Sequence, residues 1–292
     1  MQGKSVIKPQ VNVRHHQLPA SAGFALAYTE YCASEGSAQA SVFLVHGLAS
    51  CGLQFSGDAE YLAARGYRVL VPDLRGHGAS EVPDAVTLPQ FEIGTMAQDL
   101  IDILDHAHAQ KVHWVGNSLG GILALHLLGT QHRQRLSSLA LFGTCFSMSL
   151  AKPAGHLFRA AFLPGQAITA WITARLTTKS AEGRKAIENA MSRFNVAAGA
   201  AIVANVRSYD FVANALAFEQ PILILRGGKD HAVNLRLRHD IGRFDSHENV
   251  QCIDFPLGGH CLNLDMPDAF RTALKDHLER PNLQLQRLDT YP

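Results

Sequence analysis

Residues 111–121 read KVHWVGNSLGG, and this stretch decides how the rest of the chain is interpreted. KVHWV is typical of a short buried strand, and an apolar helix is predicted from Leu119 to Thr130. The turn between them holds glycines on both sides of one serine. Such a tight turn presents its serine at the amino end of a helix, where unpaired N–H groups favour developing negative charge. The pattern therefore predicts Ser118 as a nucleophile.

A serine hydroxyl needs a base and an acid that orients the base, and both are found further along the chain. Asp230 follows the predicted strand Ile222–Leu225 through a Gly-Gly-Lys loop. His260 follows the predicted strand Val250–Phe255 in the loop PLGGH. The order serine, acid, histidine at the ends of successive strands predicts a Ser118–Asp230–His260 triad.

The segment HGLAS, directly after the predicted strand Ser41–Val45, supplies a fourth part of the site. An oxyanion hole needs two backbone N–H groups that converge on one carbonyl oxygen. We expect these donors to be the amides of Leu48 and Leu119. His46 is interpreted as a structural residue of the same loop.

Short apolar runs alternate with longer amphipathic segments over most of the sequence. This alternation predicts an α/β fold with a mostly parallel central sheet flanked by helices. We expect strands at 10–15, 23–31, 41–45, 67–71, 111–115, 138–142, 222–225 and 250–255, and helices at 56–65, 95–109, 119–130 and 267–278.

The strand pattern stops between residues 146 and 212, where the sequence is Ala-rich and interrupted by Gly and Pro. We interpret 146–212 as a helical cap inserted into a core made of residues 1–145 and 213–280. Residues 281–292 are predicted to be a C-terminal tail.

Composition narrows the classes of function. The 292 residues are 47% hydrophobic and 17% charged with a net charge of +1, which indicates a globular protein without a basic nucleic-acid surface. Five cysteines without a CxxC spacing argue against a disulfide framework or a zinc site. The sequence has no signal-peptide pattern and no apolar run of about 18 residues. We therefore expect a cytoplasmic protein with no membrane span.

Five ordered motifs, HGLAS, VPDLRGHGAS, GNSLGG, RGGKD and GGH, together resemble the α/β-hydrolase superfamily over residues 23–280. The resemblance implies that Asp73, Arg75 and His77 shape a loop beside the pocket. Superfamily members with aspartate at the position of Ser118 include haloalkane dehalogenases and epoxide hydrolases, so the serine argues against both activities.

The leading hypothesis is hydrolysis of a carboxylic ester or thioester of a small to medium apolar acyl compound. The mechanism would use an acyl-enzyme and needs no metal or organic cofactor. An acyltransferase and a ligand-binding receptor stay open. So does a C–C bond hydrolase of aromatic ring-cleavage products. In that class the tight turn that carries the nucleophile, called the elbow, is similar to GNSLGG. Two features argue against the C–C hydrolase. HGLAS lacks the Gly/Pro-rich form usual in those enzymes, and Cys261 follows His260 where they often have tryptophan.

The predicted cap carries several candidate substrate contacts. Phe158, Phe162, Trp171 and Phe194 are interpreted mainly as packing residues, and any that face the cleft would make it apolar. Arg193 lies where a C–C hydrolase would use a cap arginine. Its simpler interpretation is a solvated helix residue.

Overall fold

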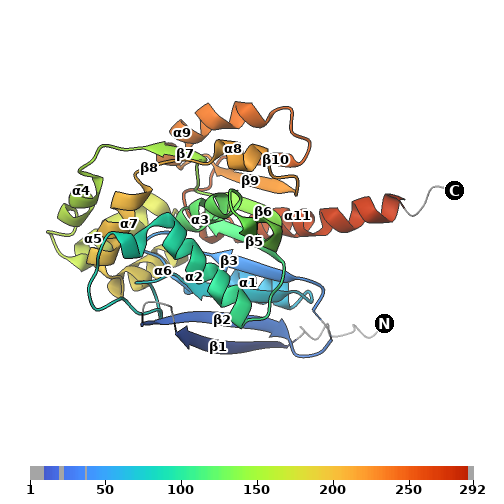
Figure 1. Cartoon of the computed structure of the whole chain (residues 1–292), viewed down its shortest axis with the longest axis horizontal. Helices are drawn as coiled ribbons and strands as arrows, with labels where there is room; N and C mark the ends of the chain where they lie inside the picture. Colours follow the sequence, from blue (N-terminus) through green and yellow to red (C-terminus); the bar gives the residue numbers. More distant parts are fainter. Residues whose placement is uncertain (1–9, 20–22, 37, 289–292) are drawn as a thin grey trace.

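The computed structural model describes residues 10–19, 23–36 and 38–288. In this part of the chain, eight strands form one sheet and two short strands form a separate pair (Figure 1). The sheet consists of β1 (Val11–Pro19), β2 (Ala25–Ala33), β3 (Ser41–Val45), β4 (Arg68–Asp73), β5 (Val112–Asn117), β6 (Leu136–Phe142), β9 (Ile222–Gly227) and β10 (Val250–Phe255); the pair is β7 (Ser147–Ser149) and β8 (Ser208–Asp210).

Eleven α-helices and four short 3-10 helices connect or cover these strands in the described residues. The α-helices are α1 (Ser56–Ala63), α2 (Ile93–His106), α3 (Leu119–Leu127), α4 (Ala154–Ala160), α5 (Gln166–Thr177), α6 (Ala181–Ser192), α7 (Val196–Val206), α8 (Val212–Leu216), α9 (His231–Ile241), α10 (Leu262–Asp265) and α11 (Pro267–Leu288). The 3-10 helices are η1 (Gly52–Phe55), η2 (Pro89–Phe91), η3 (Gln131–Arg135) and η4 (Gly242–Phe244).

The strand order is β1-β2-β4-β3-β5-β6-β9-β10. β1 and β2 pair antiparallel with each other and β2 pairs antiparallel with β4, whereas all pairings from β4 to β10 are parallel. The predicted α/β fold with a mostly parallel sheet is confirmed.

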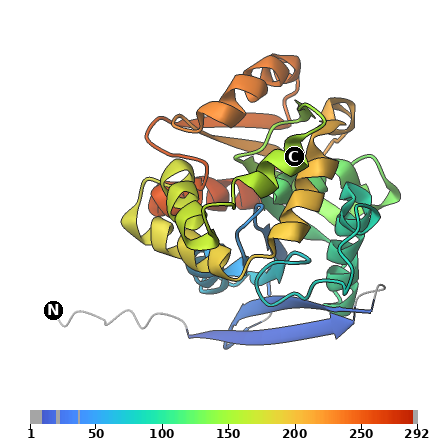
Figure 2. The ribbon, with the colours of Figure 1, turned by 90° about the vertical axis from the view of Figure 1, so that its left-hand side faces the viewer.

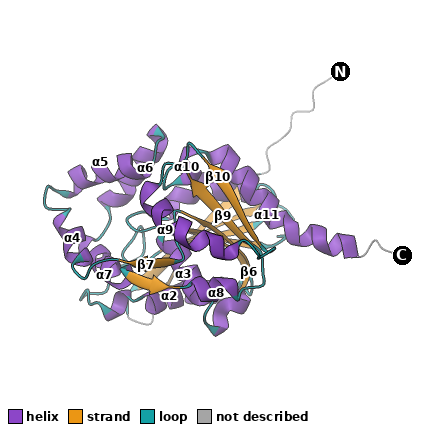
Figure 3. Cartoon of the chain, turned by 90° about the horizontal axis from the view of Figure 1, so that it is seen from above, coloured by secondary structure: helices purple, strands orange, loops and turns teal. Residues whose placement is uncertain are grey.

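Both faces of the sheet are covered, which explains the uninterrupted apolar strands. Phe43 and Trp114 pack with α2 and α3 on one face. Val42 and Leu44 pack with α1 and α11 on the other. Figure 3 shows helices on both sides of the strands.

Helices α4–α7 lie between β7 and β8 in the sequence and gather at one end of the molecule (Figures 1 and 2). β7 pairs antiparallel with β8 where the chain leaves and rejoins the rest of the fold. The sequence analysis expected helices alone in this stretch. It missed these strands because three residues are too few to show an alternating pattern.

Several expected helix boundaries were wrong. α2 ends at His106 rather than at 109, and α3 ends at Leu127 rather than at 130. α2 begins at Ile93, and the Thr95 hydroxyl donates to Pro89 O (3.2 Å). α11 continues to Leu288, so the described part of the predicted tail 281–292 is helical and residues 289–292 lie outside the described chain. The expected end at 278 coincides with a buried leucine, Leu278, and the helix continues beyond it. None of the described helices combines the length and hydropathy needed to cross a membrane.

Candidate active site

Ser118 lies in the turn between β5 and α3 with φ 49° and ψ −112°, a left-handed conformation that is rare for a residue with a side chain. Such a conformation costs roughly 1–3 kcal/mol and persists only where its surroundings enforce it. The Ser118 amide donates to Phe142 O on the neighbouring strand (3.0 Å). A Cβ at Gly120 would overlap Val45 O, so the turn fits only because that position lacks a side chain.

Asp230 and His260 meet at the carboxyl ends of β9 and β10. His260 Nδ1–H donates to Asp230 Oδ2 over 2.8 Å, and the carboxylate side chain is 9% exposed. Ser118 and His260 both line one cavity of about 340 Å³. Within the described residues, no hydrogen bond joins the Ser118 hydroxyl to His260; such bonds often form only when substrate binds.

The two amides expected to form an oxyanion hole flank the same serine. Leu119 follows Ser118 as the first residue of α3, and Leu48 lines the cavity. A Cβ placed on Gly47 would lie 3.1 Å from the Ser118 Cβ, which puts the HGLAS loop directly against the elbow. In the described chain, neither the Leu48 nor the Leu119 amide donates to another protein group.

Two buried histidines hold the HGLAS loop. The Leu74 amide donates to His46 Nε2 (3.0 Å), and the Ala49 amide donates to His77 Nε2 (3.2 Å). Burial lowers the pKa of His46 to about 4 and that of His77 to about 3. Both rings are therefore neutral near pH 7, which leaves Nε2 free to accept, and His46 acts as a structural residue as expected.

The other motif residues of the PDLRGHG loop also have structural contacts. Asp73 accepts hydrogen bonds from the amides of Gly52 (2.7 Å) and Ala79 (2.8 Å). Arg75 forms a buried ion pair with Asp99 (2.5 Å). Neither Asp73 nor Arg75 is among the described residues that line the cavity.

The sequence analysis missed a role for Asn117, the residue before the serine. Its Nδ2 donates to the carbonyls of His260 and Phe142, both at 3.2 Å. Its Oδ1 accepts from Gln54 Nε2 (3.0 Å), and Gln54 Oε1 in turn accepts from the Ser50 hydroxyl (2.8 Å). One buried amide thus connects the elbow, the histidine loop and the HGLAS loop.

The network continues from Gln54 to residues of α10, α1 and α11. Gln54 Nε2 also donates to Asn263 Oδ1 (3.2 Å), Asn263 Nδ2 donates to Asp58 Oδ2 (2.8 Å), and Arg271 Nε donates to Asp58 Oδ1 (2.7 Å). Burial raises the pKa of Asp58 to about 6. No local pattern reveals this network, because Gln54 and Asn263 are 209 positions apart.

The cavity wall opposite Ser118 comes from α4, α5 and α6 and is mainly apolar. Phe158 and Phe162 line it, as do residues that include Thr173, Ile187 and Met191. No Asp, Glu, Lys or Arg is among its described lining residues.

Three other predicted cap residues lie elsewhere. Phe194 is buried and packs edge-on against Phe158. Trp171 is 53% exposed beneath the Arg175 guanidinium, 3.9 Å from the ring centroid. Arg193 is exposed at the end of α6. The structure does not bring Trp171 or Arg193 to the cavity, because both side chains leave their helices on the solvent side.

A sequence model of the family described as serine aminopeptidase, S33 (Hydrolase_4), matches residues 36–266. The chain belongs to this family of α/β hydrolases.

Individual proteins resemble the chain at low identity. Epoxide hydrolase A of Mycobacterium tuberculosis is 29% identical over 121 residues, which cover 41% of this chain and 37% of that protein. The magnesium-chelatase 30 kDa subunit of Rhodobacter capsulatus is 26% identical over 82% of this chain and 86% of that protein. The crystal structure of a hydrolase from Pseudomonas aeruginosa superposes with a TM-score of 0.76 at 25% identity, covering 90% of this chain and 98% of that one.

Two buried thiols of the α/β hydrolase lie near the elbow. Cys261 lines the cavity, and burial raises its thiol pKa to about 12. Burial likewise raises the pKa of Cys51 to about 11. Both thiols stay protonated near pH 7, so neither forms the reactive thiolate there.

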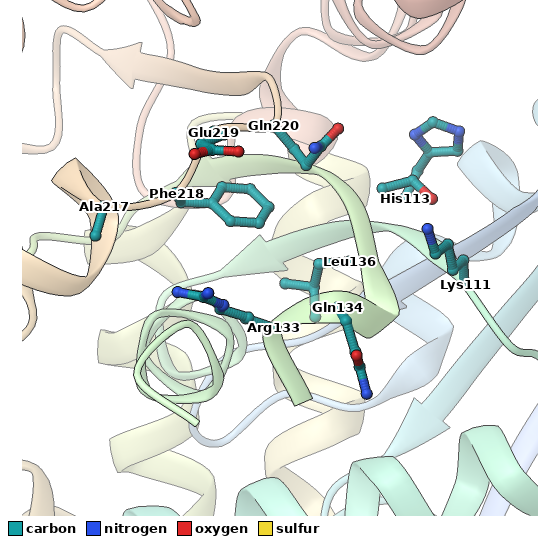
Figure 4. A pocket seen from close by; sticks show the side chains of 10 residues that line it. Lys111, His113, Arg133, Gln134, Leu136, Ala217, Phe218, Glu219 and Gln220 are labelled. Carbon is teal, nitrogen blue, oxygen red and sulfur yellow. The ribbon is translucent and has the colours of Figure 1, made fainter. Parts of the chain in front are cut away.

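A second cavity of about 510 Å³ lies at the amino ends of β5, β6 and β9 (Figure 4). Its lining includes Lys111, Arg133 and Glu219. Ser118 follows the opposite end of β5, and none of the predicted site residues lines this cavity. The cavity of about 510 Å³ is therefore remote from Ser118, although it is larger than the cavity that Ser118 lines.

Proposed function

We propose that this α/β hydrolase cleaves a carboxylic ester or thioester of a small to medium apolar acyl compound, with Ser118 as its nucleophile. The observation that carries the proposal is the 2.8 Å hydrogen bond between His260 and Asp230 at the wall of the cavity that also holds the strained Ser118.

The reaction follows a double displacement. His260 Nε2 takes the proton of the Ser118 hydroxyl as its oxygen attacks the acyl carbon, and Asp230 orients the imidazole and stabilises its cation. The amides of Leu48 and Leu119 stabilise the oxyanion. His260 then protonates the leaving alcohol or thiol, after which water attacks the acyl-enzyme by the same route.

The cavity supports a neutral, apolar acyl group. Binding the α-ammonium of an aminopeptidase substrate would require a negatively charged partner, and no carboxylate is among the described lining residues. The serine at position 118 favours an acyl-enzyme over the aspartyl chemistry that the superfamily resemblance associates with epoxide hydrolases.

We further propose that residues 146–212 act as the cap that selects the substrate, because α4–α6 supply the apolar wall of the cavity. No observation favours a C–C hydrolase, since Arg193 is exposed and is not among the described residues that line the cavity. The acyltransferase alternative differs only in the acceptor and is tested by adding alcohols to the assay.

The test is hydrolysis of p-nitrophenyl esters from acetate to laurate by the wild type, Ser118→Ala and Ser137→Ala. Ser137 lines the remote cavity and serves as the matched serine control. We expect Ser118→Ala to lower kcat by about 10⁴ or more and Ser137→Ala to leave it unchanged.

Wild-type activity in Ser118→Ala would refute the assignment of the nucleophile. No turnover of any ester or of the matching thioesters by a folded wild type would refute the ester proposal itself.

A further inference from the structure

Exposed apolar side chains are concentrated on and beside α4 and α5. Seven of the twelve exposed large hydrophobic side chains among the described residues lie within the 27 positions 150–176. They are Leu150 (48% exposed), Leu157 (64%), Leu163 (85%), Ile168 (52%), Trp171 (53%), Ile172 (44%) and Leu176 (71%). We name these seven residues the outer α4–α5 face. Concentrations of exposed apolar side chains on monomers commonly mark interaction sites.

Helix α5 presents different side chains on its two sides. Thr169, Thr173 and Thr177 recur every four residues and line the cavity of Ser118. Ile168, Ile172 and Leu176 recur with the same spacing on the solvent side. An apolar row of this kind is usually the buried side of a helix. On α5 this row is exposed, and the threonine row faces the cavity.

The charges around this face are mainly positive. Residues 147–207 contain eight of the 26 Lys and Arg residues of the chain but two of its 25 Asp and Glu residues. The two acids are Glu182 and Glu188, both on α6, and Glu188 pairs with Arg175 (3.1 Å). No acid occurs from residue 147 to 181, which spans all of α4 and α5.

We propose that the outer α4–α5 face docks the protein on an anionic lipid surface. Apolar side chains enter the boundary between headgroups and acyl chains, while neighbouring Lys and Arg side chains attract anionic headgroups. The exposed cations Lys152, Arg159 and Lys179 flank or lie within the two helices. A second copy of the chain would present the same positive charge, so charge complementarity favours the lipid surface.

This placement has a consequence for the cavity. Figures 1 and 3 show α4 and α5 at the end of the molecule away from the C-terminal part of α11. The helices that would contact the lipid also form the apolar wall opposite Ser118. Docking would thus bring the cavity next to a source of apolar acyl chains. The docking itself does not depend on the proposed ester hydrolysis.

Tryptophan fluorescence can test the proposal. Its two tryptophans are Trp114, which is fully buried in the sheet, and Trp171, which belongs to the outer face. Full-length protein is mixed with vesicles of phosphatidylcholine alone or of phosphatidylcholine with phosphatidylglycerol at equal amounts. Binding is measured by flotation, and burial of Trp171 is measured as a blue shift of its emission, which Trp171→Phe assigns.

We expect flotation and a blue shift with the anionic vesicles, both weakened by 0.5 M NaCl. The double variant Leu163→Ser/Leu176→Ser should bind at least about tenfold more weakly, because it lacks two leucines that docking would bury. Leu235→Ser is the matched control: Leu235 is 79% exposed on α9 and should not affect binding. Thermal melting of each variant checks that it is folded.

Absence of flotation with anionic vesicles would overturn the proposal. Equal loss of binding in folded Leu235→Ser would also overturn it. A blue shift that grows with protein concentration without vesicles would show that a second copy, not lipid, covers the face.

Discussion

The side-chain amide of Asn117 donates a hydrogen bond to the main-chain carbonyl of His260 over 3.2 Å. Asn117 directly precedes the predicted nucleophile, so this bond fixes the distance between the elbow and the histidine loop. The same Nδ2 also bonds to Phe142 O. Both donors of one amide are therefore used to hold the backbone of the site.

Asn117→Asp should lower kcat/KM by about 10- to 100-fold. The substitution conserves shape, but it replaces the two donors with a carboxylate oxygen that faces two carbonyl oxygens. Because Asn117 acts through His260, we expect the fall mainly in kcat, together with a changed pH profile. The assay is ester hydrolysis from pH 5 to 9.

Asn249→Asp is the control for this prediction. Asn249 Nδ2 also donates to two carbonyls, those of Phe218 (2.7 Å) and Gln220 (3.0 Å), at the amino end of β9. Stability should fall in both variants and activity only in Asn117→Asp. Equal activity of the two folded variants would show that the Asn117 bonds are merely structural.

Asp230→Asn should reduce kcat by about 10⁴ while the protein stays folded. The amide carries no negative charge and its NH2 can donate to His260 Nδ1, so the imidazole loses both its fixed tautomer and the charge that stabilises its cation. Asp240→Asn is the matched control, since Asp240 is also a buried carboxylate and accepts from Ser147 (2.9 Å). Burst and steady-state kinetics with a p-nitrophenyl ester measure both. Retention of more than a tenth of the wild-type kcat in Asp230→Asn would remove Asp230 from the mechanism.

The motifs around Ser118, Asp230 and His260 could be located from sequence because each follows an apolar strand. Strand ends that share one edge of a parallel sheet converge, so the order of the motifs already predicted their proximity. The central strands could also be predicted from sequence, because helices cover both of their faces and these strands are therefore apolar.

The side of α5 that faces the cavity could not be predicted. The large apolar residues of the helix lie on its solvent side, so the usual rule that the apolar side is buried would have pointed Trp171 inward instead of Thr173, which lines the cavity. The contacts of Gln54 could not be predicted from sequence either, because they depend on how elements far apart in the sequence pack together. α9 was missed because only Asn234, Leu237 and Asp240 are buried on it, and two of these are polar.

Ala161→Trp should shift the preferred ester toward shorter acyl chains. Ala161 lines the cavity of about 340 Å³, and a large indole there would occupy space otherwise open to the acyl group. Ala160→Trp is the control, because Ala160 is exposed at the end of α4 and does not line the cavity. The ratio of kcat/KM for octanoate to that for acetate should fall at least tenfold in Ala161→Trp alone. An unchanged ratio would place the acyl group elsewhere.

His277→Leu should stabilise the protein. His277 is 2% exposed on α11, and both of its ring nitrogens are without hydrogen-bond partners in the described chain. Burying these polar atoms costs roughly 1–3 kcal/mol, which leucine avoids at similar volume. We expect a higher free energy of unfolding in urea at pH 7.5. Loss of stability would mean that the ring is paired in solution.

The gain from His277→Leu should increase in acid. Burial lowers the pKa of His277 from 6.5 to about 3, so below pH 6.5 the unfolded wild type binds a proton that the folded state does not. This histidine therefore destabilises the wild type increasingly as the pH falls from 6.5 toward 3. Between pH 7.5 and 5.5 the advantage of the variant should grow by about 1.4 kcal/mol. His239→Leu, at a side chain 75% exposed, provides the control in the same urea titrations. A pH-independent gain would show that His277 has the same pKa in the folded and the unfolded protein.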